Sequence, residues 1–327
     1  ELGILEEEKF GNLTNAVAYF QRVHKDRPDD IFVIERLQSL WKQQERWNEY
    51  VLTAEKRIEL VKSYQNTIQL RQELMDIYET KTLEIEKAIL HGEEIFKESP
   101  EHLITILNLQ RLYKKLGNKN KLVEMYEKES KLVQEKSSKE HLVFLYLETG
   151  KIYSELAKNE EALSYFKKAV SLDPCLSEAL TRMVEILKNS KQWHELINVY
   201  EMVASLSSNK EEVEDLHIRM ANLQANETNE YNQALANYRI AYQINPKNIV
   251  AVQGMRKIFE KEEKWGEAIS SMEVESVLVE EKLRPALYSK IGNIWNEKLG
   301  MYTNAIESYC KILKYGFHRP TSEKLIQ

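Results

Sequence analysis

The chain has 327 residues, with 46 Lys and Arg against 52 Asp and Glu and a formal net charge of −6 at pH 7. Ten Gly and six Pro are less than half of the roughly 12% that average usage gives these residues, which excludes a collagen, a Gly/Pro-rich disordered tail and a β-sandwich with many turns. The acidic balance argues against a dedicated nucleic-acid binder, and no apolar run approaches the roughly 18 residues of a membrane span.

The first predicted element is a helix pair around Ala16 that ends at Pro28, and this pair returns with a period of about 72 residues. The later copies carry Ala88 and Pro100, Ala162 and Pro174, and Ala234 and Pro246, and Ala305 continues the register. Self-similarity at a fixed period is the mark of a solenoid. We therefore predict one repeat array over residues 1–327, although length alone suggests about two domains. Its approximate units are 1–65, 66–137, 138–209, 210–282 and 283–327.

Within four of the five first pairs, an aromatic residue follows the alanine at helical spacing, and a small or aliphatic residue follows the aromatic. These residues are Tyr19 and Val23, Phe166 and Ala169, Tyr238 and Ala241, and Tyr309 and Ile312. We expect each alanine to lie at a close helix crossing that admits an aromatic ring, and each proline to end its helix. Most tyrosines in this register are therefore predicted to be core residues: Tyr19, Tyr78, Tyr153, Tyr200, Tyr238 and Tyr309.

A second helix pair follows each proline, and its turn carries a tryptophan in three of the four copies. The three are Trp47, Trp193 and Trp265, whereas the fourth copy has Lys119. We expect the indole to cover the turn. Counting both kinds of pair gives about 18 helices of roughly 18–24 Å each. Because Leu2-Gly3-Ile4 parallels Ile291 to Ile294 and another helix begins near Thr321, we expect the chain to be a segment of a longer array.

Residues 143–176 resemble the tetratricopeptide (TPR) repeat, which carries small, aromatic, Ala, aromatic, Ala and Pro in this order. The matching residues are Gly150, Tyr153, Ala162, Phe166, Ala169 and Pro174. The other copies depart from this pattern, because the small residue precedes the alanine by 13 positions, as in Gly3–Ala16, rather than by 12. The resemblance implies an all-α fold, a right-handed α-α superhelix of about nine antiparallel helix pairs. It also implies a concave inner face that binds peptides or proteins, and no catalysis.

TPR modules that clamp a C-terminal carboxylate use Lys and Asn one turn apart on an inner helix, with further Lys and Arg on the next two. The corresponding inner positions lack this set, so the resemblance does not imply a chaperone-tail receptor. They hold Phe32, Glu35 and Ser39; Ile104, Leu107 and Arg111; Phe144, Leu147 and Lys151; Glu178, Thr181 and Glu185; and Val250, Gln253 and Lys257.

No residues with catalytic or metal-binding spacing were found, and we predict no cofactor and no small-molecule substrate. His194-Glu195 fails as a zinc helix because Asn198 stands where the second histidine is needed. Cys175 and Cys310 look like free thiols, which is consistent with a reducing compartment; cytoplasm is favoured, with the bacterial periplasm as the alternative. A basic cluster from Arg111 to Lys121 is interpreted as a solvated helix end, the alternative being a patch for RNA or an acidic partner.

The leading hypothesis is a non-enzymatic scaffold whose inner helix faces bind other proteins or peptides. Register alone selects its candidate contact residues, which are Glu35, Arg111, Lys114, Lys151, Glu155, Glu185 and Lys257. Nucleic acid is disfavoured as a partner. Three alternatives stay open: the regulatory arm of an enzyme whose catalytic domain lies outside this segment, an RNA-processing scaffold of the half-TPR type, and a self-associating structural subunit.

Overall fold

The computed structural model describes residues 2–61, 64–134 and 138–315, and these residues form 18 α-helices. The chain divides into an N-terminal unit, residues 1–169, and a C-terminal unit, residues 170–327, with the boundary inside α10. The helices that begin in the first unit are α1 (Leu2–Glu8), α2 (Leu13–Asp26), α3 (Ile31–Gln43), α4 (Trp47–Leu60), α5 (Tyr64–Thr80), α6 (Ile85–Glu98), α7 (Leu103–Leu116), α8 (Lys119–Val133), α9 (Lys139–Glu155) and α10 (Asn159–Leu172).

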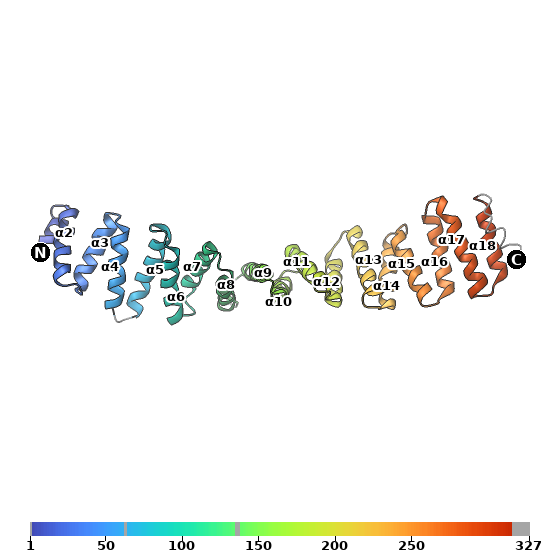
Figure 1. Cartoon of the computed structure of the whole chain (residues 1–327), viewed down its shortest axis with the longest axis horizontal. Helices are drawn as coiled ribbons and strands as arrows, with labels where there is room; N and C mark the ends of the chain where they lie inside the picture. The colour runs from blue at the N-terminus through green and yellow to red at the C-terminus, as the bar shows by residue number, and fades with distance from the viewer. Residues whose placement is uncertain (1, 62–63, 135–137, 316–327) are drawn as a thin grey trace. The chain divides into compact units, whose positions relative to one another are not determined.

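The C-terminal unit contains the remaining eight helices of the described residues. They are α11 (Ser177–Asn189), α12 (Trp193–Leu206), α13 (Lys210–Asn226), α14 (Tyr231–Ile244), α15 (Ile249–Lys261), α16 (Trp265–Leu278), α17 (Arg284–Asn293), which continues into a π-helical turn over 294–298, and α18 (Tyr302–Leu313). Short turns connect the helices, so each odd-numbered helix lies antiparallel to the even-numbered helix that follows it (Figure 1). The predicted all-α class and the nine helix pairs are thereby confirmed.

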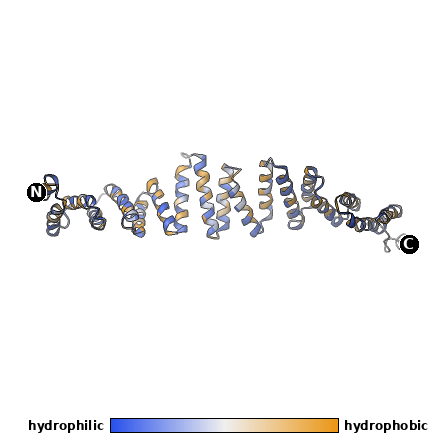
Figure 2. Cartoon of the chain, turned by 90° about the horizontal axis from the view of Figure 1, so that it is seen from above, coloured by the Kyte–Doolittle hydropathy of each residue, from blue (hydrophilic) through white to orange (hydrophobic). Residues whose placement is uncertain are grey.

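Many helices present apolar residues on one side and polar residues on another (Figure 2), as expected for helices that bury one face. The core holds the alanine of each first pair: Ala16, Ala88, Ala162 and Ala234 are fully buried, and Ala305 is 3% exposed. The prediction that these alanines lie at close helix crossings agrees with this burial.

All nine turns within the helix pairs share one backbone device: a residue with positive φ lies two positions before the even-numbered helix. These residues are Gly11, Glu45, Leu83, Gly117, Ala157, Lys191, Asn229, Glu263 and Gly300. A left-handed residue after a helix lets the next N–H bond back to a carbonyl of the last turn. In the α9–α10 turn, for example, the Lys158 N–H donates to the Tyr153 carbonyl at 2.9 Å.

The turn geometry explains why the spacing from small residue to alanine is 13 in four copies. In these copies the first helix ends with an additional residue, because the N–H immediately before the left-handed residue already donates five positions back, whereas in the α9–α10 turn the five-back donor, Lys158, follows the left-handed residue. The four bonds are Phe10 to Leu5 (3.3 Å), Thr82 to Ile77 (3.1 Å), Thr228 to Leu223 (3.2 Å) and Leu299 to Ile294 (3.2 Å). A wider, π-type last turn therefore absorbs the additional residue, and the alanine keeps its place at the crossing.

Leu83 pays a conformational cost at its turn, which yields a stability prediction. Its φ is 59°, where a residue with a Cβ costs about 1–2 kcal/mol, and its side chain is 73% exposed. We expect Leu83→Gly to raise the free energy of unfolding by about 0.5–1 kcal/mol, after the added freedom of glycine in the unfolded chain is subtracted. Urea denaturation followed by circular dichroism measures the change. Gly117→Ala, at a φ of 73°, is the matched reverse change and should lower the free energy of unfolding. If both substitutions changed the free energy of unfolding in the same direction, this account would be contradicted.

In three of the first pairs a glycine makes room for an aromatic ring from the following helix. A Cβ on Gly150 would lie 2.6 Å from the Phe166 ring, and one on Gly292 would lie 2.3 Å from the Tyr309 ring. Gly3 stands in the same relation to Phe20, at 3.0 Å. The aromatic residue four positions after the alanine is therefore the one that enters the crossing.

The prediction for Tyr19 and Val23 was wrong by one residue. Tyr19 is 39% exposed and Val23 is 41% exposed, while Phe20 is buried. Adjacent residues of a helix point about 100° apart, so choosing the tyrosine rather than the phenylalanine placed the solvent side of α2 in the core. Of the other tyrosines, Tyr78, Tyr200, Tyr238 and Tyr309 are buried as predicted, and Tyr153 is half-buried.

Each turn tryptophan is the first residue of its helix and is half-buried, and Trp47 and Trp265 lie against the next helix pair. Lys81 Nζ lies 5.2 Å from the centroid of the Trp47 ring, and Lys298 Nζ lies 5.3 Å from that of Trp265. Trp265 also contacts a core cluster that includes Ile291 and Ile294. The indole therefore connects successive pairs in addition to covering its own turn.

Candidate binding surface

All seven candidate contact residues lie on odd-numbered helices, but intramolecular ion pairs occupy several of them. Glu35 of α3 pairs with Arg57, Lys151 of α9 with Glu148 at 3.0 Å, and Glu155 with Lys119 at 3.0 Å. The other four are Arg111 and Lys114 of α7, Glu185 of α11 and Lys257 of α15, and all four are exposed. Of these, only Arg111 has an ion-pair partner among the described residues.

The basic cluster of α7 and α8 is largely neutralised. Arg111 Nη2 lies 2.6 Å and Lys115 Nζ lies 2.5 Å from the carboxylate oxygens of Glu79, whose side chain is 2% exposed. Lys121 also lies near two carboxylates. A carboxylate this deeply buried needs its cations to offset the loss of hydration, so Arg111 and Lys115 stabilise the α5–α7 packing. Lys114 is the exposed cation of this cluster that has no such partner within the described ranges.

A polar contact recurs between the two helices of the second pairs. In α3 and α4, Arg57 donates to Gln38 and Glu35. In α15 and α16 the charges are reversed, because buried Glu275 accepts from Gln253 at 2.8 Å and pairs with Arg256 at 2.8 Å. The α7–α8 pair instead uses buried Glu129, which Gln110 and His141 contact at 2.7 and 2.9 Å. These side chains connect helices and are not free for a ligand.

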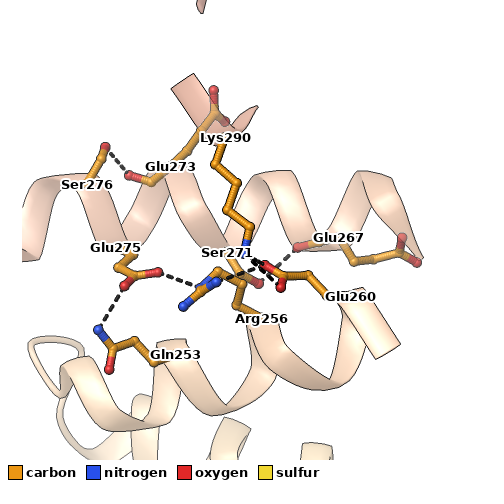
Figure 3. A network of polar contacts seen from close by, with 9 residues as sticks. All are labelled: Gln253, Arg256, Glu260, Glu267, Ser271, Glu273, Glu275, Ser276 and Lys290. Atoms are coloured by element: carbon orange, nitrogen blue, oxygen red, sulfur yellow. Dashed lines mark hydrogen bonds and ion pairs between the residues drawn. The ribbon is translucent and has the colours of Figure 1, made fainter. Parts of the chain in front are cut away.

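The Arg256 contacts extend from α16 to α17 (Figure 3). Arg256 Nη1 lies 2.8 Å from Glu260, and Lys290 of α17 reaches the same carboxylate at 2.8 Å. Partial burial raises the pKa of Glu260, but the hydrogen bonds from Lys290 and Arg256 outweigh burial and hold this pKa below the ordinary carboxyl value. The network fixes α15 against both neighbours.

A cavity of about 160 Å³ lies between α13 and α15, and Arg256 is not among its lining residues. Asn222 and Asn226, one turn apart on α13, line one wall, and Lys257 and Lys261, one turn apart on α15, line the other. No acidic residue belongs to this lining. The Tyr238 hydroxyl donates to Asn222 Oδ1 at 2.6 Å, which orients that amide.

Two further contacts define the shape of the α13–α15 cavity. A Cβ on Gly254 would lie 2.3 Å from the Tyr238 ring, so glycine allows α15 to approach the ring that lies beneath it. The Lys261 ammonium lies 4.7 Å from the centroid of the Tyr231 ring, a cation–π contact that leaves its N–H donors available. A second cavity, of about 380 Å³, adjoins the first because it shares Asn222 and Asn226, and Trp193, Lys188 and Arg219 are among its lining residues.

Of the candidate residues chosen from the sequence, only Lys257 lines one of these two cavities. Asn222, Asn226 and Lys261 were missed, although each belongs to a pair spaced by four residues in the sequence. That spacing places two like side chains on one helix face and was the available signal. On α15 the cavity extends from Val250 to Lys261, so the inner positions Val250, Gln253 and Lys257 all line it, whereas none of the inner positions given above belongs to α13.

The described residues hold no group of three or more His, Cys, Asp or Glu side chains placed to bind a metal ion. Cys175 and Cys310 are both exposed free thiols. Within the same residues, no helix has the length and apolarity needed to span a membrane.

Comparison with known proteins points to one repeat family. Two family models described as tetratricopeptide repeat match the chain, one over residues 105–140 and the other over residues 145–174. The matched residues lie on α7 to α10. No curated protein matches the chain.

Solved structures resemble the chain at low identity. It is similar to YrrB, a TPR protein with an unusual peptide-binding site, with 16% identity and a TM-score of 0.35 over 61% of this chain and 97% of that one. Naa15/Naa10 bound to HypK-THB matches with 12% identity and a TM-score of 0.43, over 93% of this chain and 61% of that one. A tetratricopeptide repeat protein from Parabacteroides merdae matches with 14% identity and a TM-score of 0.33, over 80% and 98%.

Proposed function

Because this chain is a tetratricopeptide repeat protein, we propose that it is a non-enzymatic scaffold that holds other proteins in a larger assembly. Proteins of this class bind peptides or proteins along their repeats. In a repeat array each unit packs only on its neighbours, so one face of many successive helices stays available to partners. The odd-numbered helices are the first helices of their pairs and supply this face.

One observation carries the proposal: three of the odd-numbered helices, α3, α7 and α15, expose an apolar side chain at the same position. The second residue of α3 is Phe32, that of α7 is Ile104 and that of α15 is Val250, with exposed fractions of 51%, 59% and 47%. On α9, Phe144 is 50% exposed. Single exposed apolar residues are ordinary, but recurrence at one register position favours a contact surface.

Site-specific photocrosslinking tests the proposal. A photoreactive phenylalanine analogue replaces Ile104 or Phe144 in the protein in its native source, and partner adducts are identified by mass spectrometry. The controls replace Leu52 of α4 and Leu90 of α6, which are 66% and 60% exposed but lie on even-numbered helices. We expect protein adducts from positions 104 and 144 and few from 52 and 90. Equal yields at all four positions would reject the odd-numbered helices as the binding face.

A further inference from the structure

We propose that the cavity between α13 and α15 binds an acidic segment of a partner protein in an extended conformation. This inference rests on the proposed scaffold function and names the chemistry of one of its ligands. The site consists of Asn222 and Asn226 on α13 and of Lys257 and Lys261 on α15, and is called the Asn/Lys groove below.

Charge is the first observation that points to an acidic ligand. On the same two helices, Arg219 pairs with Asp215 at 2.7 Å and Arg256 pairs with Glu260 and Glu275 at 2.8 Å. Lys257 and Lys261 are exposed and have no carboxylate partner within the described residues. In a chain whose net charge is −6, two cations one turn apart on a cavity wall, neither of them paired with a carboxylate of the described residues, form a local positive field that attracts carboxylates.

Hydrogen-bonding capacity is the second observation. Each asparagine amide has two N–H donors and an acceptor oxygen, and the structure uses only Asn222 Oδ1, which accepts from Tyr238. Within the described residues, the amide N–H groups of Asn222 and the whole amide of Asn226 make no other hydrogen bond and remain for a ligand. A peptide main chain offers carbonyl and N–H partners of this kind, so the asparagine wall suits the backbone while the lysine wall suits acidic side chains.

The dimensions select an extended segment. One turn of a helix, about 5.4 Å long and 10–12 Å wide with its side chains, fills roughly 400–600 Å³, which exceeds the cavity volume of about 160 Å³. Side chains one turn apart on a helix lie about 5–6 Å apart, close to the roughly 6.6 Å between alternate residues of an extended chain. A segment that runs along the groove can therefore place two alternate carboxylates on Lys257 and Lys261. The recognised pattern is an acidic residue, any residue, and a second acidic residue.

Selection from a display library of random twelve-residue peptides on the immobilised full chain tests the groove. We expect enrichment of Asp and Glu at alternate positions, and loss of that enrichment on the Lys257→Glu/Lys261→Glu variant. The matched control is Lys210→Glu/Lys247→Glu, which makes the same charge change at exposed lysines that line neither cavity. Unaltered thermal unfolding of both variants shows that each one folds.

Fluorescence anisotropy then measures the most enriched peptide. Two changes each remove both charge pairs: the Lys257→Glu/Lys261→Glu variant of the protein, and a peptide in which Gln replaces Glu. Either change should weaken binding by about tenfold or more, which corresponds to about 1.4 kcal/mol. The Lys210→Glu/Lys247→Glu control should stay close to wild type. Binding that is indifferent to Glu→Gln or to the groove variant would overturn the proposal, as would a preference for a phosphoserine peptide over its Glu form. Crosslinks from Ile104 and Phe144, in the N-terminal unit, report the scaffold function independently of these outcomes.

Discussion

Arg256→Met is expected to destabilise α15 to α17 by about 3 kcal/mol, because removing one partner of a buried ion pair leaves the other charge uncompensated. The Glu275 side chain is 4% exposed and that of Arg256 is 14% exposed, and their charged atoms lie 2.8 Å apart. Methionine keeps an unbranched apolar stem but supplies no cation to Glu275 or Glu260. Gln253 alone then remains as a donor to Glu275, and a neutral amide does not replace a guanidinium.

Hydrogen–deuterium exchange of peptides from α15 to α17 measures this change, because repeat arrays open locally. We expect protection there to fall by roughly two orders of magnitude, since 1.4 kcal/mol corresponds to a factor of ten. The double variant Arg256→Met/Glu275→Met should recover most of the loss, because replacing both partners by apolar groups can be nearly neutral. Lys282→Met, in a pair with Glu280 whose side chains are 75% and 70% exposed, is the exposed control and should leave exchange unchanged. A loss of protection that the double variant does not restore would show that packing, and not charge, holds α15.

Much of the fold could be predicted from the sequence because its strongest signals are local. Ala16, Ala88 and their equivalents recur at one period, and the prolines mark the helix ends, so the helix pairs follow from spacing alone. Which side of a single helix faces the core is harder to predict than the positions of the helix pairs. The Tyr19 error arose because two aromatic residues are adjacent in α2 and the pattern did not separate them, whereas the burial of Phe20 depends on its fit against Gly3.

The two turn lengths show a different limit. The sequence displays the spacings of 12 and 13 residues, but it does not show where the additional residue lies. The structure places that residue in the last turn of the first helix, where the Thr82 N–H reaches the Ile77 carbonyl. Backbone geometry decides this, and no side-chain pattern reports it.

The candidate site was less predictable than the fold. The repeat register identified the odd-numbered helices as the candidate binding face. A charged residue on these helices can either neutralise a buried charge of the chain or face a ligand, and the sequence does not distinguish the two roles. Arg111 is used by a buried carboxylate from α5, a helix two positions earlier. Lys257 has no such partner and lines a cavity with Asn222. Which cations are neutralised depends on contacts between distant segments, and so does the set of residues that share a cavity.

Phe166→Ala is expected to lower the free energy of unfolding of the α9–α10 pair by about 3–5 kcal/mol, the usual cost of removing a buried phenylalanine ring. Phe166 is fully buried, and its ring occupies the space that the missing Cβ of Gly150 leaves open. By itself, Gly150→Ala should cost about 1–3 kcal/mol through overpacking, since the new Cβ would lie 2.6 Å from that ring. Urea denaturation and hydrogen exchange of the α9–α10 peptides measure both variants.

Combining the two substitutions shows whether Gly150 is needed to leave space for the Phe166 ring or is needed for its backbone conformation. Once the Phe166 ring is removed, the Cβ of Gly150→Ala has free space, and alanine then gains about 1 kcal/mol over glycine from helix propensity. The double variant should therefore be more stable than Phe166→Ala alone, so that the effect of Gly150→Ala changes sign with its partner. Gly266→Ala in α16, where a Cβ meets nothing within 4 Å, is the matched control and should be stabilising in the wild-type chain. If Gly150→Ala destabilises both backgrounds equally, the glycine is required for its backbone and the ring does not explain it.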